Sequence, residues 1–179
     1  MKFAMKNLFK LYSILMTFPR FMTRKVRGFI VLQYVKSHKN EIFVGGKTKL
    51  SRQTILNRNP NFNGMIIAGS GEVIIGDNFH SGDNCIILTG NHNYDNGKKI
   101  PYDDTYIDKK VIIEDNVWFG SRVIVLGGVT IGEGAIIQAG AVVVNSIPVC
   151  GIAGGNPAKV FKYRDKIHYY DLKEKGLFH

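Results

Sequence analysis

His92 is the residue whose surroundings most favour a chemical role in this 179-residue chain. It stands at the start of a polar stretch, residues 89–95 (Thr-Gly-Asn-His-Asn-Tyr-Asp), which is followed by two lysines and an Ile-Pro-Tyr-Asp-Asp run. A neutral imidazole, whose pKa is ordinarily about 6.5, can accept a proton from a hydroxyl group at neutral pH. His92 is therefore a candidate for proton transfer. The alternative is a loop histidine that only bonds to backbone groups.

Metal and disulfide chemistry are not indicated. Two cysteines, Cys85 and Cys150, are too few for a disulfide framework, and each is expected to be a small buried thiol in a reducing compartment. No group of cysteines and histidines has the spacing of a zinc site. We therefore expect no metal cofactor and a cytoplasmic protein.

The chain around His92 contains a repeat of six residues, which predicts the elements that position it. Bulky residues recur at this interval in one series, and smaller residues lie four places later in a second series. The first series is Ile113, Phe119, Val125, Ile131, Ile137, Val143 and Val149; the second is Val117, Val123, Val129, Ala135, Ala141 and Ile147. The same phase reaches back through Ile75, Ser81 and Ile87, and further upstream through Val44, Leu50, Leu56, Phe62 and Ala68, with Thr48, Thr54 and Ile66 in the second series.

A period of six is neither helical nor simply alternating, so each short strand must be followed by a turn. Three such units close one three-sided coil, and stacked coils pair their backbones about 4.8 Å apart. The sequence thus predicts an all-β solenoid over residues 42–152, with a bulge near residues 69–72 and an interruption at about 90–110 that contains His92. Asn and Asp at the corners, such as Asp77, Asn78, Asp115 and Asn116, are expected to be structural because they tolerate a positive φ.

Three motifs resemble one known family. They are residues 112–120 (Ile-Ile-Glu-Asp-Asn-Val-Trp-Phe-Gly), residues 128–132 (Gly-Val-Thr-Ile-Gly) and residues 154–160 (Gly-Gly-Asn-Pro-Ala-Lys-Val). Over about residues 42–164 the chain is similar to the hexapeptide-repeat acyltransferases, and most similar to the sugar O-acetyltransferases of the maltose or galactoside type and those that modify capsule or lipopolysaccharide. The resemblance implies a left-handed parallel β-helix, a homotrimer, and acetyl-CoA in the groove between neighbouring solenoids.

The resemblance also implies roles for the residues near the interruption. It makes His92 the base that takes the proton of a sugar hydroxyl while this hydroxyl attacks the thioester directly. Trp118 would border the acceptor, and Asn61 or Asn63 would match an asparagine that contacts acceptor and acetyl group. His80, which points outward between Phe79 and Ser81, would contact the acceptor or assist His92, or be an exposed bystander. Tyr94 and Asp95 would bind sugar hydroxyls, or belong to a solvated loop.

The resemblance also implies which residues bind the cofactor, acetyl-CoA. The small residues Gly120, Ser121 and Ala139 match places where the family binds the pantetheine arm through backbone groups. Val144 and Asn145 stand where the family often has a threonine followed by a lysine, and this position would lie near the adenine end of CoA. Lys159 and Lys162 match basic positions that meet the CoA phosphates, or they belong to a solvated basic tail.

Charge is distributed unevenly along the chain. Residues 1–40 contain nine Lys or Arg and no Asp or Glu, whereas residues 41–158 have a net charge of −2 and residues 159–179 one of +3. The nearly neutral middle lacks the basic and aromatic face of a nucleic-acid reader, so no nucleic-acid binding is expected.

These shifts in composition divide the chain into three parts. We predict a basic, partly helical segment (1–41), the β-helix domain (42–158) and a C-terminal helix or cap (159–179), with a helix expected over about residues 160–177. The apolar run of residues 5–18 is too short and too charged to span a bilayer. The N-terminal segment then either covers the open end of the solenoid or a neighbour, or lies on an anionic membrane at the inner face of the bacterial envelope.

The predicted function is an acetyl-CoA-dependent O-acetyltransferase acting on a sugar or polysaccharide. An N-acetyltransferase acting on an amino sugar nucleotide and a non-enzymatic scaffold in glycan synthesis remain as alternatives. The zinc carbonic anhydrases that share this solenoid would need three converging histidines, and only His80 and His92 are expected near the groove.

Overall fold

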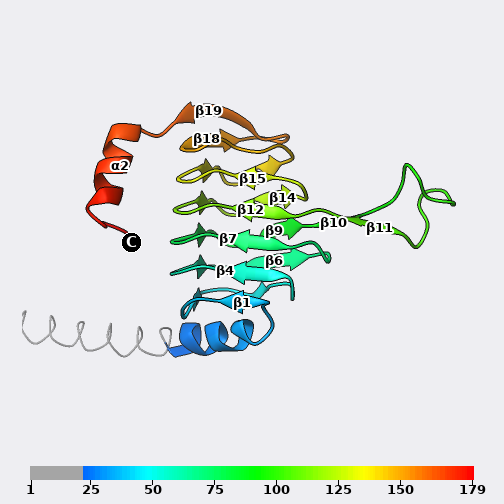
Figure 1. The fold of residues 1–179 in the computed structure, drawn as a ribbon, viewed down its shortest axis with the longest axis horizontal. Coiled ribbons are helices and arrows are strands. Elements are labelled where there is room, and N and C mark those ends of the chain that lie inside the picture. Colours follow the sequence, from blue (N-terminus) through cyan, green and yellow to red (C-terminus); the bar gives the residue numbers. More distant parts are fainter. Residues whose placement is uncertain (1–21) are drawn as a thin grey trace, which may run out of the picture.

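The computed structural model describes residues 22–179, so the predicted apolar segment of residues 5–18 lies outside the described residues. The fold is a parallel β-solenoid of about six coils, with a helix at its base and a second helix beside it (Figure 1). The first sheet consists of β1 (Ser37–His38), β4 (Thr54–Leu56), β7 (Val73–Ile75), β12 (Val111–Ile113) and β15 (Thr130–Ile131). The second consists of β2 (Phe43–Val44), β5 (Asn61–Phe62), β8 (His80–Ser81), β13 (Trp118–Phe119), β16 (Ile136–Ile137), β18 (Gly151–Gly154) and β19 (Lys159–Tyr163). The third consists of β3 (Thr48–Lys49), β6 (Met65–Ala68), β9 (Cys85–Leu88), β14 (Ile124–Leu126) and β17 (Val142–Val143). We call these sheets A, B and C.

The three sheets confirm the predicted three-sided coil. The chain passes from sheet A to B to C in each coil, and the strands of successive coils pair in parallel, as in β7 with β12 and β8 with β13. Within a strand, alternate side chains point into and out of the coil. The strand pattern of β7, buried–half-buried–buried, shows this directly.

The core is one narrow column filled by both predicted series. All members from Ile113 to Val143 and from Val117 to Ile147 are buried. Phe62, Phe79 and Phe119 pack against one another in successive coils, with ring centroids 5.7 and 5.0 Å apart and the second pair edge to face. Each fully buried side chain of this size stabilises the fold by about 1.5–3 kcal/mol relative to exposure. Phe79 is bulky, so the small Ser81 next to it fits the same layer.

The predicted phase is wrong at two places. Met65 and Ile67, rather than Ile66 and Ala68, face the core, because the turn after Phe62 is one residue shorter than in the regular repeat. This turn ends at Gly64, whose φ of 144° favours glycine. At the other end Val149 is 38% exposed. Ile147 pairs with Ile131, 16 residues earlier, whereas regular coils pair residues 18 apart, so the turn before Ile147 is two residues shorter.

The corners between sheets A and B confirm the structural role predicted for their Asp and Asn residues. Asn59, Asn78 and Asn116 all have φ between 54° and 59°, and their side-chain amides form a ladder of hydrogen bonds from coil to coil, 3.0 and 2.9 Å long. Asp115 Oδ1 accepts a hydrogen bond from the backbone N–H of Asp77. These side chains are therefore occupied in holding successive coils in register.

Both open ends of the solenoid are covered. A helix over residues 22–32 lies across the base, with Val31 buried in the core and Gly28 packed on Ile42 (Figure 1). At the other end β19 turns back and pairs antiparallel with β18. The predicted C-terminal helix is therefore shorter than expected: α2 (Lys166–Glu174) begins only after this strand, with Asp165 as its N-cap.

Candidate active site

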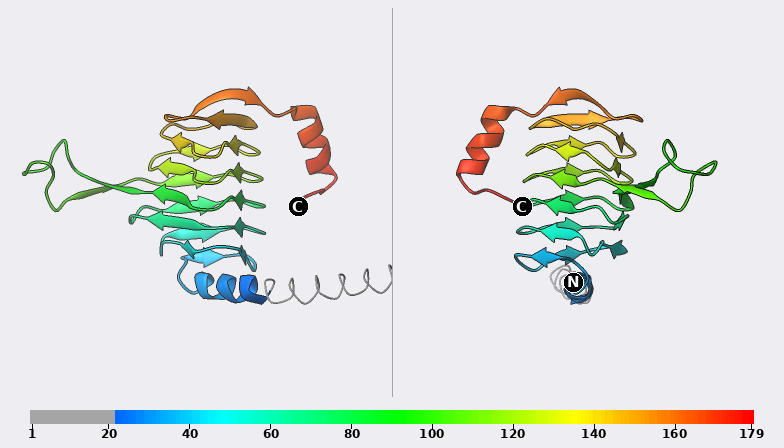
Figure 2. Two further views of the ribbon diagram at one scale, coloured as in Figure 1. Left: turned by 180° about the vertical axis from the view of Figure 1, so that it is seen from behind. Right: turned by 45° about the vertical axis from the view of Figure 1, so that its right-hand side comes forward.

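The predicted interruption is a long hairpin that leaves the solenoid after β9. Its strands β10 (Gly90–His92) and β11 (Tyr106–Asp108) pair antiparallel, with His92 opposite Tyr106. The hairpin projects from one side of the solenoid, whereas α2 lies on the opposite side (Figure 2). At its base Asp108 Oδ1 accepts a hydrogen bond from the Ser70 N–H, which joins the hairpin to the bulge of the coil below. His92 is therefore presented by a paired strand that is attached to the scaffold.

Two tyrosines of the hairpin hold the imidazole of His92. The ring of Tyr102 is stacked on it, with centroids 3.6 Å apart and planes 16° apart, and Tyr106 contacts it at 4.3 Å. Nδ1 of His92 is buried without a hydrogen-bond partner among the described residues, whereas Nε2 is not buried. The imidazole is thus fixed in orientation by aromatic packing and keeps one nitrogen accessible.

His92 lines a cleft of about 450 Å³ where the hairpin meets the outer face of sheet C. Tyr94 and Asp95 come from the hairpin, and Leu88, Leu126 and Val144 come from the ends of the sheet C strands. The structure therefore brings three of the predicted site residues together: His92, Tyr94 and Asp95. A cleft of this size can hold a small organic ligand.

The other predicted acceptor residues lie on a different face. His80 and Trp118 are paired neighbours on the outer side of sheet B, and Asn61 lies next to His80 with Nδ2 3.5 Å from its Nε2. Asn63 lies beyond them in the turn toward sheet C, where its Nδ2 donates to the Ser81 carbonyl oxygen. Within one described chain, His92 therefore lies apart from the other predicted acceptor residues, which are His80, Asn61, Asn63 and Trp118.

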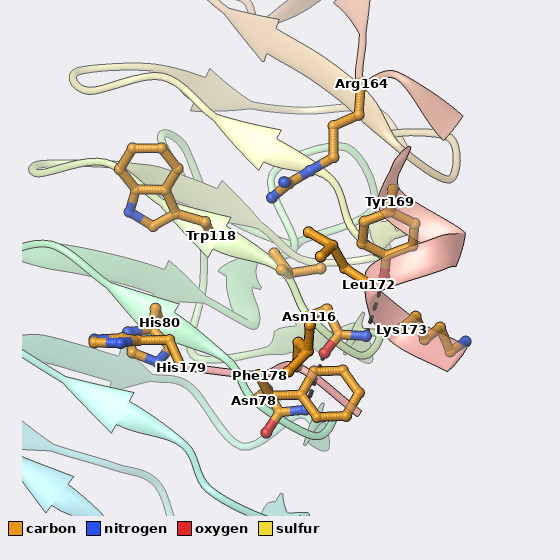
Figure 3. A pocket seen from close by; sticks show the side chains of 12 residues that line it. Asn78, His80, Asn116, Trp118, Arg164, Tyr169, Leu172, Lys173, Phe178 and His179 are labelled. Carbon is orange, nitrogen blue, oxygen red and sulfur yellow. Dashed lines mark hydrogen bonds between the residues drawn. The ribbon is translucent and has the colours of Figure 1, made fainter. Parts of the chain in front are cut away.

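A second cavity, of about 500 Å³, covers His80 and Trp118 (Figure 3). Its opposite wall is formed by the C-terminal residues 164–179, including Arg164, Phe178 and His179. The ring of His179 packs 5.2 Å from that of His80, and burial, followed by the charge of His179, lowers the pKa of His80 below its ordinary value. Both effects favour the neutral form of His80, which can act as a hydrogen-bonding group.

Specific contacts hold the C-terminal residues against the corner of sheets A and B. The Tyr169 hydroxyl donates to Glu133 and accepts from Asn116, and Arg164 Nε donates to the Gly134 carbonyl oxygen. Burial, together with the hydrogen bond to Glu133, raises the pKa of Tyr169 well above its ordinary value, so this hydroxyl stays a donor. Gly134 has a φ of 68°, and a Cβ there would lie 2.7 Å from the Tyr169 ring.

Three predicted cofactor residues form a smooth corner between sheets B and C. A Cβ on Gly120 would lie 2.6 Å from the backbone N of Ala139, and the Gly140 N–H donates to the Ser121 carbonyl oxygen. A hydrogen bond from the Ser121 side chain lowers the pKa of Asp83 in the coil below. The narrow stacking and small side chains leave the backbone of this corner open to a long, thin ligand.

The remaining cofactor candidates are exposed and spread apart. Asn145 follows β17 beside Val144, which lines the His92 cleft, and Lys159 and Lys162 lie on β19 at the end of the solenoid. The structure brings Gly120, Ser121 and Ala139 together, but not Asn145 or the two lysines.

Sequence reasoning missed the aromatic support of His92 and the C-terminal wall. Tyr102 lies ten residues from His92, and only the hairpin pairing places them face to face. Arg164 lines the same cavity as Trp118 (Figure 3) only because β19 reverses the direction of the chain. In the sequence, only the tyrosines near His92 could have indicated the contact between His92 and Tyr102.

Two negative findings apply to residues 22–179. No group of three or more His, Cys, Asp or Glu side chains there could hold a metal ion. None of the helices in this range has the length and apolar character needed to cross a membrane.

The repeat, the interrupting hairpin and the small-residue corner define a hexapeptide-repeat solenoid. Residues 110–145 match the family model for bacterial transferase hexapeptide (six repeats), so this part of the chain is such a repeat and the predicted relationship is confirmed. No curated protein sequence matches the chain significantly.

Solved structures that are similar to this chain include several acetyltransferases. The chain is similar to a maltose O-acetyltransferase from Clostridium difficile 630, with 29% identity, 73% of this chain and 66% of that chain covered, and a TM-score of 0.58. It is also similar to a hexapeptide-repeat acetyltransferase of Vibrio cholerae O1 biovar eltor, complexed with acetyl coenzyme A, with 27% identity, 71% of this chain and 64% of that chain covered, and a TM-score of 0.52. It shares its fold with a galactoside acetyltransferase in complex with coenzyme A, with 21% identity, 80% and 72% coverage, and a TM-score of 0.60. The chain thus spans slightly less than two thirds of the length of the first two proteins.

Proposed function

We propose that the protein is an acetyl-CoA-dependent O-acetyltransferase whose acceptor is a sugar or polysaccharide hydroxyl. The observation that carries this proposal is the position of His92: a half-buried imidazole on the hairpin that interrupts a hexapeptide-repeat solenoid, with one nitrogen accessible at a cleft. Similarity to structures that bind acetyl coenzyme A or coenzyme A supports the choice of donor.

In the proposed reaction, His92 accepts the proton of the acceptor hydroxyl while its oxygen attacks the thioester carbonyl carbon. The tetrahedral intermediate collapses, the C–S bond breaks, and the imidazolium returns the proton to the leaving CoA sulfur. No enzyme nucleophile is needed, because binding both substrates side by side supplies much of the acceleration. The stacked Tyr102 ring would keep the imidazole oriented throughout.

We place the pantetheine arm along the corner formed by Gly120, Ser121 and Ala139, where the open backbone can bond to its amides. Lys159 and Lys162 would meet the phosphates as point charges, and Asn145 would lie near the adenine. The acceptor would lie against Trp118 and His80, with Asn61, Asn63, Tyr94 and Asp95 as further hydrogen-bonding groups.

This arrangement requires more than one chain, because His92 and Trp118 lie on different faces of a single solenoid. The outer face of sheet C is aliphatic in every coil from β6 onward, with Ile66, Leu88 and Val144 exposed. Contiguous apolar surface of this kind marks an interaction site. We propose that three chains associate through this face, so that the hairpin of one chain meets the sheet B side of another.

The central test is acetyl transfer by His92→Ala. With acetyl-CoA as donor and maltose or a galactoside as first acceptors, release of free CoA by the variant should fall about 10²- to 10⁴-fold, the usual contribution of a general base. The matched control is His38→Ala, because His38 is an exposed histidine on β1.

Equal rates for His92→Ala and the unmodified protein would reject the base assignment. Mild alkali should release acetate from the product, since an ester is cleaved under conditions that leave an amide intact. An alkali-stable product would favour the N-acetyltransferase alternative instead.

A further inference from the structure

The helix over residues 22–32 has two apolar faces, and only one of them packs on the solenoid. Val31 and Gly28 face the first coil, where a Cβ on Gly28 would lie 2.4 Å from the Ile42 carbonyl oxygen. Met22, Val26, Phe29 and Ile30 are 53%, 56%, 67% and 52% exposed. The packed face explains how the helix closes the solenoid, and the exposed face needs another explanation.

The exposed residues form one continuous stripe. At 100° per residue, Met22, Val26, Phe29 and Ile30 fall within an arc of about 100° on the side of the helix away from Val31. Within residues 22–179, nothing covers this stripe. Four large apolar side chains on a single stripe, each more than half exposed, are costly to leave in water.

The surroundings of the stripe are strongly basic. Arg24, Lys25 and Arg27 lie on the same helix, with Lys25 paired to Glu41 and Arg27 bonded to the Gly45 carbonyl oxygen. The preceding residues 1–21 add Lys2, Lys6, Lys10 and Arg20, and residues 1–40 contain no acidic residue. The partner of this surface should therefore combine apolar and anionic character.

We infer that this stripe is a membrane-binding surface that inserts between the headgroups of an anionic lipid bilayer. Helices with an apolar stripe flanked by Lys and Arg bind at such interfaces, with the apolar side chains below the headgroups and the cations among them. A second copy of this chain fits less well, because it would bring an equally basic N-terminal segment against this one. The inference is independent of the proposed enzymatic function.

The test is binding of the full-length protein to lipid vesicles. The protein should sediment with vesicles enriched in phosphatidylglycerol, bind pure phosphatidylcholine vesicles much more weakly, and dissociate as salt is added. The double variant Val26→Ser/Phe29→Ser should bind at least about tenfold more weakly, because two buried apolar side chains are lost. The matched control is Ile167→Ser, since Ile167 is an apolar residue on α2 that is 87% exposed.

A site-specific probe separates this surface from residues 1–21. An environment-sensitive fluorophore on Phe29→Cys should shift to the blue when phosphatidylglycerol vesicles are added, and one on Ile167→Cys should not. Failure to bind these vesicles, undiminished binding by the double variant, or an unchanged probe at position 29 would each overturn the inference. A smaller oligomer for the double variant in solution would also overturn it, by assigning the stripe to a second copy.

Discussion

At the scale of single residues, the candidate site depends on how one imidazole is held. Tyr102 stacks on the face of His92 and Tyr106 packs against it, whereas no described side chain bonds to Nδ1. In this chain, aromatic packing takes the place of the carbonyl or carboxylate that often orients a catalytic histidine. The orientation of the base should therefore depend on the shape of its neighbours more than on their charge.

Tyr102 is accordingly predicted to be a positioning residue. Tyr102→Leu should lower kcat about 10- to 100-fold, since small misplacements of a catalytic group have effects of this size, with little change in the KM for acetyl-CoA. Tyr102→Phe keeps the stacked ring and should retain nearly full kcat. Steady-state kinetics of both variants check this, and an equal loss in Tyr102→Phe would show that the hydroxyl matters instead.

At the scale of elements, the C-terminal residues 164–179 act as a wall opposite His80 and Trp118. They are attached at both ends, through Tyr169 and Arg164 at the corner and through His179 near Asn59, whose Nδ2 donates to the His179 carbonyl oxygen. The α2 helix itself has no buried residue, so these contacts, and not a core, hold it in place. Changes at the end of the wall should therefore alter the cavity without unfolding the solenoid.

The double variant Phe178→Ala/His179→Ala is predicted to affect the acceptor selectively. It should raise the KM for the acceptor sugar about tenfold, because it removes two lining side chains, and leave the KM for acetyl-CoA unchanged. Ile167→Ala, on the exposed side of α2, is the control. A parallel rise in both KM values would argue that the wall supports the whole site and not the acceptor pocket.

The sequence predicted the solenoid well and the site less well, for a physical reason. A six-residue period is a local property, because each inward residue is specified by its own strand, and it therefore identified the core from Ile113 to Val143. Where the length of a turn changes, as after Phe62 and before Ile147, the period cannot show which neighbouring residue moves into the core. The contact between His92 and Tyr102 depends on the register of the hairpin, which the period does not determine. A helix was predicted over residues 160–177, but the first residues of this range form β19, which pairs with β18, and the helix begins only at Lys166.

At the scale of the whole molecule, the apolar face of sheet C is the natural place for association. Its outward residues include Ile86 and Ile124, which pair with each other in adjacent coils. The hairpin with His92 leaves the solenoid directly after β9 of this sheet. A neighbour packed on sheet C would therefore lie beside His92, which is what a site shared between chains requires.

Ile86→Glu is predicted to separate the chains. The unmodified protein should behave as a trimer in light scattering, and the variant as a monomer that keeps its β-sheet circular dichroism, because three carboxylates would be buried without partners at the interface. Acetyl transfer should be lost together with the trimer. Ile167→Glu is the control, and a variant Ile86→Glu that remains trimeric would exclude sheet C as the interface.

The covered ends of the solenoid restrict how copies of it can meet. The helix of residues 22–32 lies under the first coil, and β19 runs opposite to the strands beneath it (Figure 1). Among residues 22–179, the helix covers the first coil and β19 covers the edge of sheet B at the last coil, so another molecule cannot continue the strand ladder at these two places and grow into a fibre. Solenoids can still contact each other side by side. Such contact places the three sheets, and not the two ends of the solenoid, where two chains can form a common site.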